Sequence, residues 1–144
     1  MYLTHIRTYV YNVAMKKDLI NQVTTSYICY YIAFCPRYRR KLFIIPGMIE
    51  RVKELSLEYC TKKKLSLLDI YFSEDTIFLE VLSIPGLSPN TIIHQWKMFL
   101  SSFLLDEFEE IRNMPNLWTK AYYISTKGFD SELLEQFINS QRKK

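Results

Sequence analysis

The sequence predicts an α+β fold: a ferredoxin-like split βαβ antiparallel sheet with helices, plus one further C-terminal helix. Three observations predict it. Segments rich in β-branched and aromatic residues alternate with segments of helical apolar spacing, in the order β, α, β, β, α, β, α. Two apolar segments are joined only by Ser73-Glu74-Asp75, which is typical of an antiparallel hairpin. The chain of 144 residues, 49% hydrophobic and 24% charged, has the size and composition of one compact domain.

The first half of the domain contains the opening strand, a helix and the hairpin. Residues 26–34 are β-branched and aromatic and are followed by Pro36, which predicts a strand. Over residues 48–64, apolar side chains recur at helical spacing and lysines occupy the last turn, where they suit the helix dipole. Residues 65–72 and 76–82 are the two predicted strands of the hairpin.

The second half begins with a loop over residues 84–90, which leads into a second long helix. The apolar stripe of that helix runs from Ile92 to Leu104, and we expect the helix to end near residues 113–115, where a proline stands. Residues 117–126 then predict a fourth strand.

A last helix is predicted after the turn at Gly128, with Asp130 or Ser131 as its N-cap. Residues 1–22 carry no clear pattern and form an N-terminal arm of unknown structure. The predicted domain therefore spans residues 23–144, with no repeat and no linker inside it.

Composition excludes several classes of protein. Apolar runs are too short for a membrane span, and the 3 glycines provide no glycine-rich phosphate loop. Cys29, Cys35 and Cys60 form no CxxC motif, which favours a reducing cytoplasm with the thiols as small apolar groups. His5 and His94 lie far apart in the sequence, so a zinc site has little support.

One segment carries a specific resemblance. Residues 31–41 read Tyr-Ile-Ala-Phe-Cys-Pro-Arg-Tyr-Arg-Arg-Lys and closely resemble the opening strand and basic turn of the single-tyrosine HUH transposases. These are the TnpA-type transposases of small insertion sequences and the REP-associated tyrosine transposases. Residues 88–97, 117–123 and 126–128 resemble further parts of that family in the same order. The resemblance extends over about residues 26–141, most of the chain.

The resemblance implies a dimer that cuts single-stranded DNA at hairpin ends, using a tyrosine nucleophile and a divalent metal ion held by two histidines. Histidines at alternate strand positions share one face and converge on one ion. Aligned on the family's Asp-His-apolar-His, this chain has Asp75-Thr76-Ile77-Phe78, so Thr76 and Phe78 replace both histidines.

The family's nucleophilic tyrosine aligns with Phe137, and a further polar metal ligand one helical turn later aligns with Gln141. A phenyl ring has no oxygen that can attack phosphate. Gln141 is a possible remnant of the metal site, although plain helix surface is the expected reading for such a residue. With two independent losses at one centre, we expect no catalytic residue, no metal site and no cofactor.

Other residues of the chain could replace the lost metal ligands and the lost nucleophile, and both alternatives stay open. Glu80 shares a strand face with the two replaced positions, and with Glu74 and Asp75 it offers carboxylates to Mg²⁺ or Mn²⁺. Tyr122 or Tyr123 offers a displaced nucleophile. We nevertheless expect the three acidic residues to be solvated and the two tyrosines to be packing residues of a strand.

Basic residues carry the remaining functional signal. The expected nucleic-acid contacts are Arg37, Tyr38, Arg39, Arg40 and Lys41, which combine guanidinium groups for phosphate with a ring for stacking. Residues 62–64 and 142–144 form two further basic clusters, which are more typical of solvated surface.

Three hypotheses follow. The first is a transposase-like protein that recognises single-stranded or hairpin DNA and does not cleave it. It is expected to act as a homodimer paired through sheet edges, with no membrane as a partner. The second is an active transposase with a rearranged metal site holding Mg²⁺ or Mn²⁺ and a displaced nucleophile. The third is an oligomeric scaffold or interaction module.

Overall fold

The structure is a computed structural model that describes residues 4–7 and 27–141. Most of the N-terminal arm and the last basic cluster, residues 142–144, lie outside the described residues. Within the arm, residues 4–7 form a strand, so this part of it belongs to the sheet.

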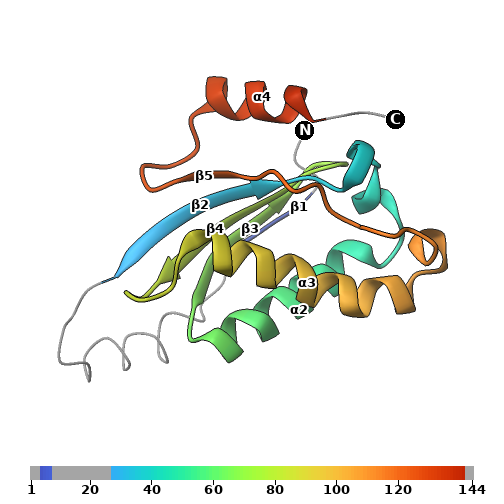
Figure 1. The fold of residues 1–144 in the computed structure, drawn as a ribbon, viewed down its shortest axis with the longest axis horizontal. Coiled ribbons are helices and arrows are strands. Elements are labelled where there is room, and N and C mark those ends of the chain that lie inside the picture. The colour runs from blue at the N-terminus through green and yellow to red at the C-terminus, as the bar shows by residue number, and fades with distance from the viewer. Residues whose placement is uncertain (1–3, 8–26, 142–144) are drawn as a thin grey trace.

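Five antiparallel strands form one sheet in the order β1-β3-β4-β2-β5 (Figure 1). Their bounds are β1 Thr4–Arg7, β2 Ile28–Phe34, β3 Ser66–Phe72, β4 Ile77–Ser83 and β5 Tyr123–Ser125. The order β3-β4-β2-β5, with β4 central and beside β2, is that of the split βαβ arrangement. The ferredoxin-like fold is therefore confirmed, and β1 adds an outer strand beside β3.

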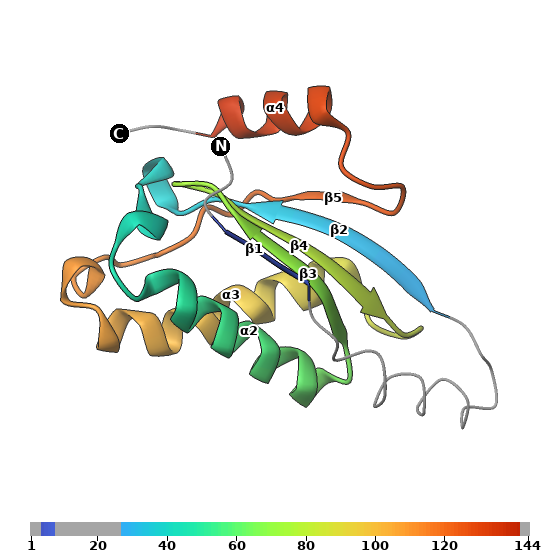
Figure 2. The same cartoon turned by 180° about the vertical axis from the view of Figure 1, so that it is seen from behind.

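The helices divide between the two faces of the sheet. Figures 1 and 2 show α2 (Met48–Lys63) and α3 (Pro89–Glu107) side by side on one face and α4 (Ser131–Ser140) on the other. In the core between α2 and α3, Trp96 Nε1 donates to Ser56 Oγ at 3.1 Å. The Tyr59 hydroxyl donates to the Ile92 carbonyl at 2.9 Å, so both large polar rings are satisfied where they are buried.

Helix α3 ends at Glu107, earlier than the expected end near residues 113–115. Phe108 leaves the helical conformation, with φ −115° and ψ 111°, and a short 3-10 turn, η4 (Glu109–Ile111), follows it. The Arg51 guanidinium on α2 donates to Glu107 at 2.7 and 2.9 Å, which ties the end of α3 to its neighbour. The spacing of apolar residues could not reveal the end of α3 at Glu107, because Phe108 and Ile111 continue the apolar pattern into η4.

Strand β5 has only three residues, whereas the expected strand ran over residues 117–126. Trp118 pairs with Pro36 in an isolated bridge, and regular pairing with β2 resumes only at Tyr123. Between them, the Thr119 and Ala121 carbonyls accept hydrogen bonds from Lys97 Nζ on α3. These carbonyls therefore bond to a helix side chain, and the strand is interrupted.

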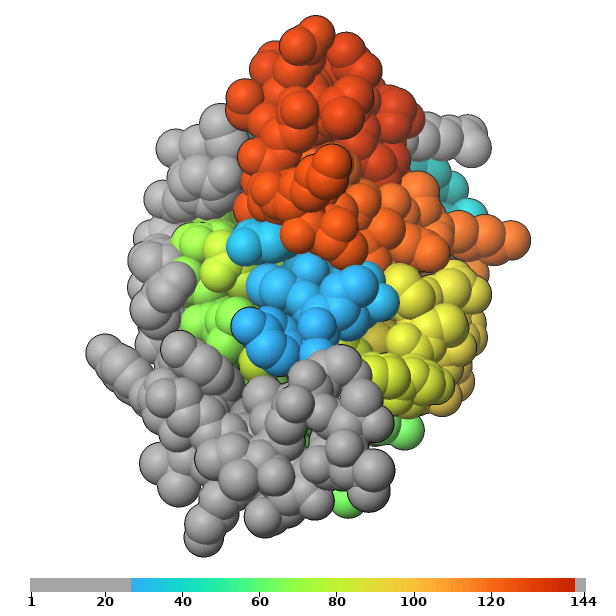
Figure 3. Space-filling model, turned by 90° about the vertical axis from the view of Figure 1, so that its left-hand side faces the viewer, coloured from blue at the N-terminus to red at the C-terminus, as the bar shows by residue number. Residues whose placement is uncertain are grey.

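A small second cluster holds α4 against the sheet. Leu134 packs with Ala33 and Phe78, and the Phe129 ring meets Phe78 edge-on at 5.8 Å. Asp130 caps the helix by accepting from the Leu133 N–H at 3.0 Å, as the sequence predicts. Figure 3 shows β5 and α4, in orange and red, above the surface formed by β2 in blue.

In the described parts of the chain, no helix is long and apolar enough to cross a bilayer.

Candidate nucleic-acid interface

The basic turn, residues 37–41, leaves the end of the central strand β2. Its backbone is held by the Arg37 N–H, which donates to the Leu117 carbonyl at 2.8 Å. Tyr38 and Arg39 both adopt left-handed conformations, with φ 62° and 50°. Non-glycine residues rarely adopt positive φ, and such strain persists only where surrounding contacts hold it, often at functional sites.

Ion pairs divide the cations of the basic turn into two groups. Arg39 Nη2 lies 3.2 Å from Asp75 Oδ2, with both side chains mostly buried, so Arg39 clamps the turn to the β3–β4 connection. Lys41 Nζ lies 3.3 Å from Glu74 Oε2, and both of these side chains are exposed. Arg37 and Arg40 form no ion pair with the acidic residues of the described ranges. Their charge is therefore the part of the turn that an anion can neutralise.

Tyr38 lies beside Arg37. The guanidinium carbon of Arg37 is 5.4 Å from the centre of the Tyr38 ring, within cation–π range. Both side chains are partly exposed, and Arg40 is exposed. The turn thus presents the guanidinium groups of Arg37 and Arg40, with the Tyr38 ring beside that of Arg37.

The positions aligned with the family's histidines lie where β4 begins. Thr76 is buried, and its hydroxyl donates to Asp75 Oδ1 at 3.1 Å while lying 3.4 Å from Cys35 Sγ. Burial raises the pKa of the Cys35 thiol, which therefore stays neutral at ordinary pH. Phe78, 1% exposed, is in the apolar cluster under α4.

The positions aligned with the nucleophile and the further ligand lie at the end of α4. The Phe137 ring is 6.3 Å from that of Tyr123. Gln141 is only 8% exposed, so the expectation of an exposed helix-surface glutamine is wrong. Its Nε2 donates to the Phe137 carbonyl at 3.2 Å and thereby closes the end of the helix.

These residues do not fit the divalent metal ion that the family resemblance implies. Thr76 offers one hydroxyl, already bonded to Asp75, and Phe78 offers no donor atom. Gln141 could offer only one neutral amide oxygen, and its Nε2, which is not a metal-ligand atom, is bonded to the backbone of its own helix. We therefore assign no chemical step to a metal at this place.

The carboxylates that the sequence offered as substitutes are divided among other partners. Glu74 pairs with Lys41 and Asp75 with Arg39. Glu80 Oε1 is 3.3 Å from the Tyr71 hydroxyl, which donates to Asp69 Oδ2 at 2.9 Å. Within residues 4–7 and 27–141, no group of three or more His, Cys, Asp or Glu residues is arranged to hold a metal.

The two candidate substitute nucleophiles have separate partners. The Tyr123 hydroxyl accepts from the Asp130 N–H at 3.0 Å and so holds the turn before α4. The Tyr122 hydroxyl is 3.4 Å from Asn90 Oδ1 at the start of α3. Neither tyrosine is in the basic turn.

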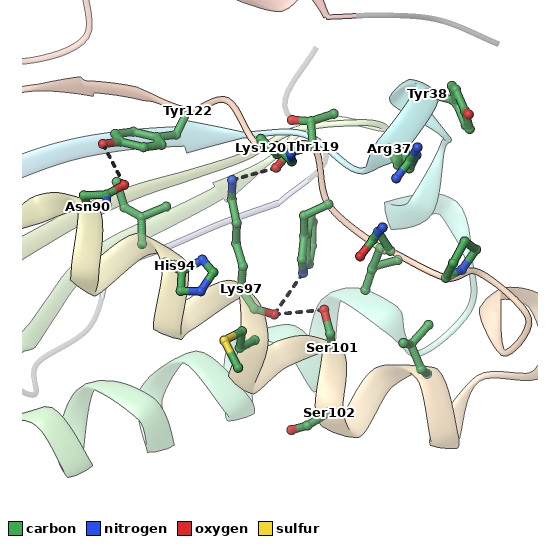
Figure 4. Close-up of a pocket in the computed structure, with 17 residues that line it drawn as sticks. Arg37, Tyr38, Asn90, His94, Lys97, Ser101, Ser102, Thr119, Lys120 and Tyr122 are labelled. Atoms are coloured by element: carbon green, nitrogen blue, oxygen red, sulfur yellow. Dashed lines mark hydrogen bonds between the residues drawn. The ribbon is translucent and has the colours of Figure 1, made fainter.

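A hollow of about 890 Å³, which we call the α3 cleft, opens between α3 and the segment before β5. Figure 4 shows Lys97 rising from α3 toward Thr119, with Arg37 and Tyr38 at one end and Tyr122 at the other. Lys97 is 8% exposed, and this burial lowers its pKa from 10.5 to about 8. Sequence analysis missed this residue, although its spacing from Ile93 and Leu104 places it on the buried stripe of the helix.

The sheet, the helices on both of its faces and the basic turn together define a domain of the transposase type. The chain belongs to the family described as "Transposase IS200 like", whose model matches residues 24–141. This confirms the family that the residues around the basic turn indicated. No curated protein sequence gives a significant match.

Two solved structures are similar in fold. A candidate transposase from Deinococcus radiodurans R1 superposes with a TM-score of 0.76 at 15% identity, covering 86% of this chain and 98% of that one. A REP-associated tyrosine transposase bound to a REP hairpin gives a TM-score of 0.52 at 6% identity, covering 79% of this chain. This chain matches 64% of the length of that second protein, so part of it has no counterpart here.

Proposed function

We propose that this chain is a transposase-family protein that binds single-stranded or hairpin DNA and does not cut it. The observation that carries the proposal is the basic turn, where Arg37 and Arg40 stand without acidic partners among the described residues and the Tyr38 ring lies beside Arg37. Guanidinium groups bind phosphate and an exposed ring stacks on bases, the combination used on single strands. The REP hairpin bound by the similar tyrosine transposase supports DNA as the partner.

The rigidity of the turn supports the same function. Two successive left-handed residues are held by the Arg39–Asp75 ion pair and by the backbone bond to Leu117. A preformed turn loses less conformational entropy on binding than a flexible one. In this proposal Arg39 positions the turn, whereas Arg37 and Arg40 contact phosphate.

The absence of cleavage rests on chemistry. Phe137 has no nucleophilic oxygen, and Thr76 and Phe78 provide no pair of metal ligands. We also expect a homodimer acting in the cytoplasm, with an outer strand of the sheet as the pairing edge. Light scattering coupled to size-exclusion chromatography tests the dimer, and a monomeric mass would contradict it.

Fluorescence anisotropy with labelled hairpin and single-stranded DNA, over a series of salt concentrations, tests binding. Arg37→Ala combined with Arg40→Ala is expected to weaken binding and to reduce the log–log salt slope by about one unit for each lost phosphate contact. The matched control, Lys62→Ala with Lys63→Ala, removes two exposed charges from α2 and should leave the slope nearly unchanged. Equal losses for both double variants would mean only a general charge effect.

A denaturing gel after incubation with Mn²⁺ tests cleavage. Intact DNA with no covalent protein adduct is the expected result. A nicked strand or an adduct would instead support an active transposase with a rearranged site. Failure to bind either DNA at low salt would refute DNA binding and leave the scaffold hypothesis.

A further inference from the structure

We infer that Asn116 is a positioning residue that holds the Arg37 guanidinium in place for a DNA phosphate. The inference deepens the proposed function and rests on it, because the anion that Arg37 binds is taken to be a phosphate of single-stranded or hairpin DNA. Asn116 acts through Arg37 and needs no DNA contact of its own.

Backbone pairing brings Asn116 to the basic turn from a distant part of the chain. The Arg37 N–H donates to the Leu117 carbonyl at 2.8 Å, and Pro36 pairs with Trp118 in an antiparallel bridge. Because the two segments run antiparallel, the residue before Leu117 lies opposite the residues that follow Pro36. The same backbone contacts that fix the turn therefore place Asn116 beside it.

The side-chain amide of Asn116 joins a donor to an acceptor. Its Oδ1 accepts from Arg37 Nη1 at 3.0 Å, and its Nδ2 donates to the Pro115 carbonyl at 3.2 Å. The partners assign this orientation, because the opposite one would set the amide nitrogen against the guanidinium and the amide oxygen against the carbonyl. Asn116 is thus a neutral acceptor whose own direction is fixed.

A neutral acceptor holds Arg37 without cancelling its charge. The Asn116 bond uses one of the five N–H donors of the guanidinium, and the Tyr38 ring lies 5.4 Å from the guanidinium carbon. Within residues 4–7 and 27–141, Arg37 forms no ion pair. Its whole charge is therefore left for a phosphate, whereas a carboxylate in the place of Asn116 would neutralise it.

Holding this side chain matters because arginine has many rotamers. Immobilising one such side chain at the moment of binding lowers affinity by about two- to tenfold relative to a side chain that is already held. Arg37 is partly exposed, so Asn116 and Tyr38 supply the restraint that dense packing supplies in a core.

Fluorescence anisotropy with hairpin DNA over a series of salt concentrations separates restraint from charge. Asn116→Ala should weaken binding by about two- to tenfold and keep the log–log salt slope, because Arg37 keeps its charge. Asn116→Asp keeps an acceptor but pairs with Arg37, so it should reduce the slope by about one unit, as Arg37→Ala does. The matched control, Asn113→Ala, removes another exposed amide and should bind as the wild type does.

A double-mutant cycle tests whether Asn116 acts through Arg37. In the Arg37→Ala background, Asn116→Ala is expected to cause no further loss of affinity. If Asn116→Ala binds DNA as tightly as the wild type, or adds its full loss to that of Arg37→Ala, the inference is overturned and the proposed function stands.

Nitrogen-15 relaxation of the Arg37 Nε–Hε group, in the protein without DNA, tests the restraint itself. Restricted motion in the wild type and larger motion in Asn116→Ala support the positioning of Arg37. Equal motion in both proteins overturns it, whether or not DNA binds. If the wild type binds neither hairpin nor single-stranded DNA, the proposed function fails, and the assignment of the anion to DNA fails with it.

Discussion

The buried ammonium of Lys97 makes the stability of the protein depend on pH in a defined direction. In the unfolded chain the lysine keeps its proton up to its ordinary pKa of 10.5, whereas in the folded protein it releases the proton above a pKa of about 8. Between these values the unfolded state binds more protons, so the free energy of unfolding rises with pH. Lys97→Met removes the titrating group and keeps a side chain of similar length.

The magnitude follows from the two pKa values. The contribution of Lys97 to the free energy of unfolding is nearly constant while the pH stays below its folded-state pKa of about 8. It then grows by about 1.4 kcal/mol by about pH 9 and by about 3 kcal/mol near pH 10.5. Burial raises the pKa of the Cys35 and Cys60 thiols, which lowers stability as the pH rises above their ordinary value of 9.0. The difference between wild type and variant cancels the contribution of Cys60, and that of Cys35 only in part, because the Lys97 charge lowers the pKa of its thiol.

Urea unfolding of wild type and Lys97→Met at a series of pH values between about 7 and 9.5 measures that difference. The stability of the wild type relative to the variant is expected to increase with pH by about 2 kcal/mol over this range. Lys120→Met, which removes an exposed lysine from the same cleft, serves as the control and should follow the wild type. A difference that stays flat, or that falls with pH, would refute the uncompensated burial of Lys97.

Three further changes test the fold and the basic turn. Tyr38→Gly relieves the backbone strain of a non-glycine residue at positive φ, and it should raise the free energy of unfolding by about 1 kcal/mol while weakening DNA binding. A lower melting temperature of the variant would contradict this strain. Leu134→Ala removes the buried anchor of α4, costing about 2–4 kcal/mol of docking, and hydrogen exchange should speed up in α4 but not in β4. Trp96→Phe leaves the buried Ser56 hydroxyl without its donor and should cost about 1–3 kcal/mol in urea unfolding, so an unchanged midpoint would argue against this bond.

Local pattern was sufficient for most elements of the fold. The β3–β4 hairpin, the start of α2 at Met48 and the Asp130 cap of α4 each follow from residues close together in the sequence. The misplaced ends have distant causes. At the end of α3, Phe108 leaves the helical conformation and packs against the core, and before β5 Lys97 of α3 takes the backbone carbonyls that would otherwise pair in the strand.

The candidate site was predictable only in part, for the same reason. The basic turn stands out as a run of cations, but no pattern pairs Arg39 with Asp75 or leaves Arg37 and Arg40 without acidic partners within residues 4–7 and 27–141. Ion pairs between residues this far apart require the folded sheet. The buried Lys97 carried a signal in its helical spacing, but its contact with the Thr119 carbonyl depends on how the chain returns to the sheet.

The central place of β4 determines the order in which the sheet can be assembled. Its pairing with β3 needs only a short turn, whereas its pairing with β2 joins Ile28 to Ser83 and requires a much longer loop to close. Local contacts form faster than distant ones, so the hairpin is the natural nucleus and β2 the late arrival. Substitutions in the turn at residues 73–76 should therefore slow folding, and those in β5 should mainly accelerate unfolding.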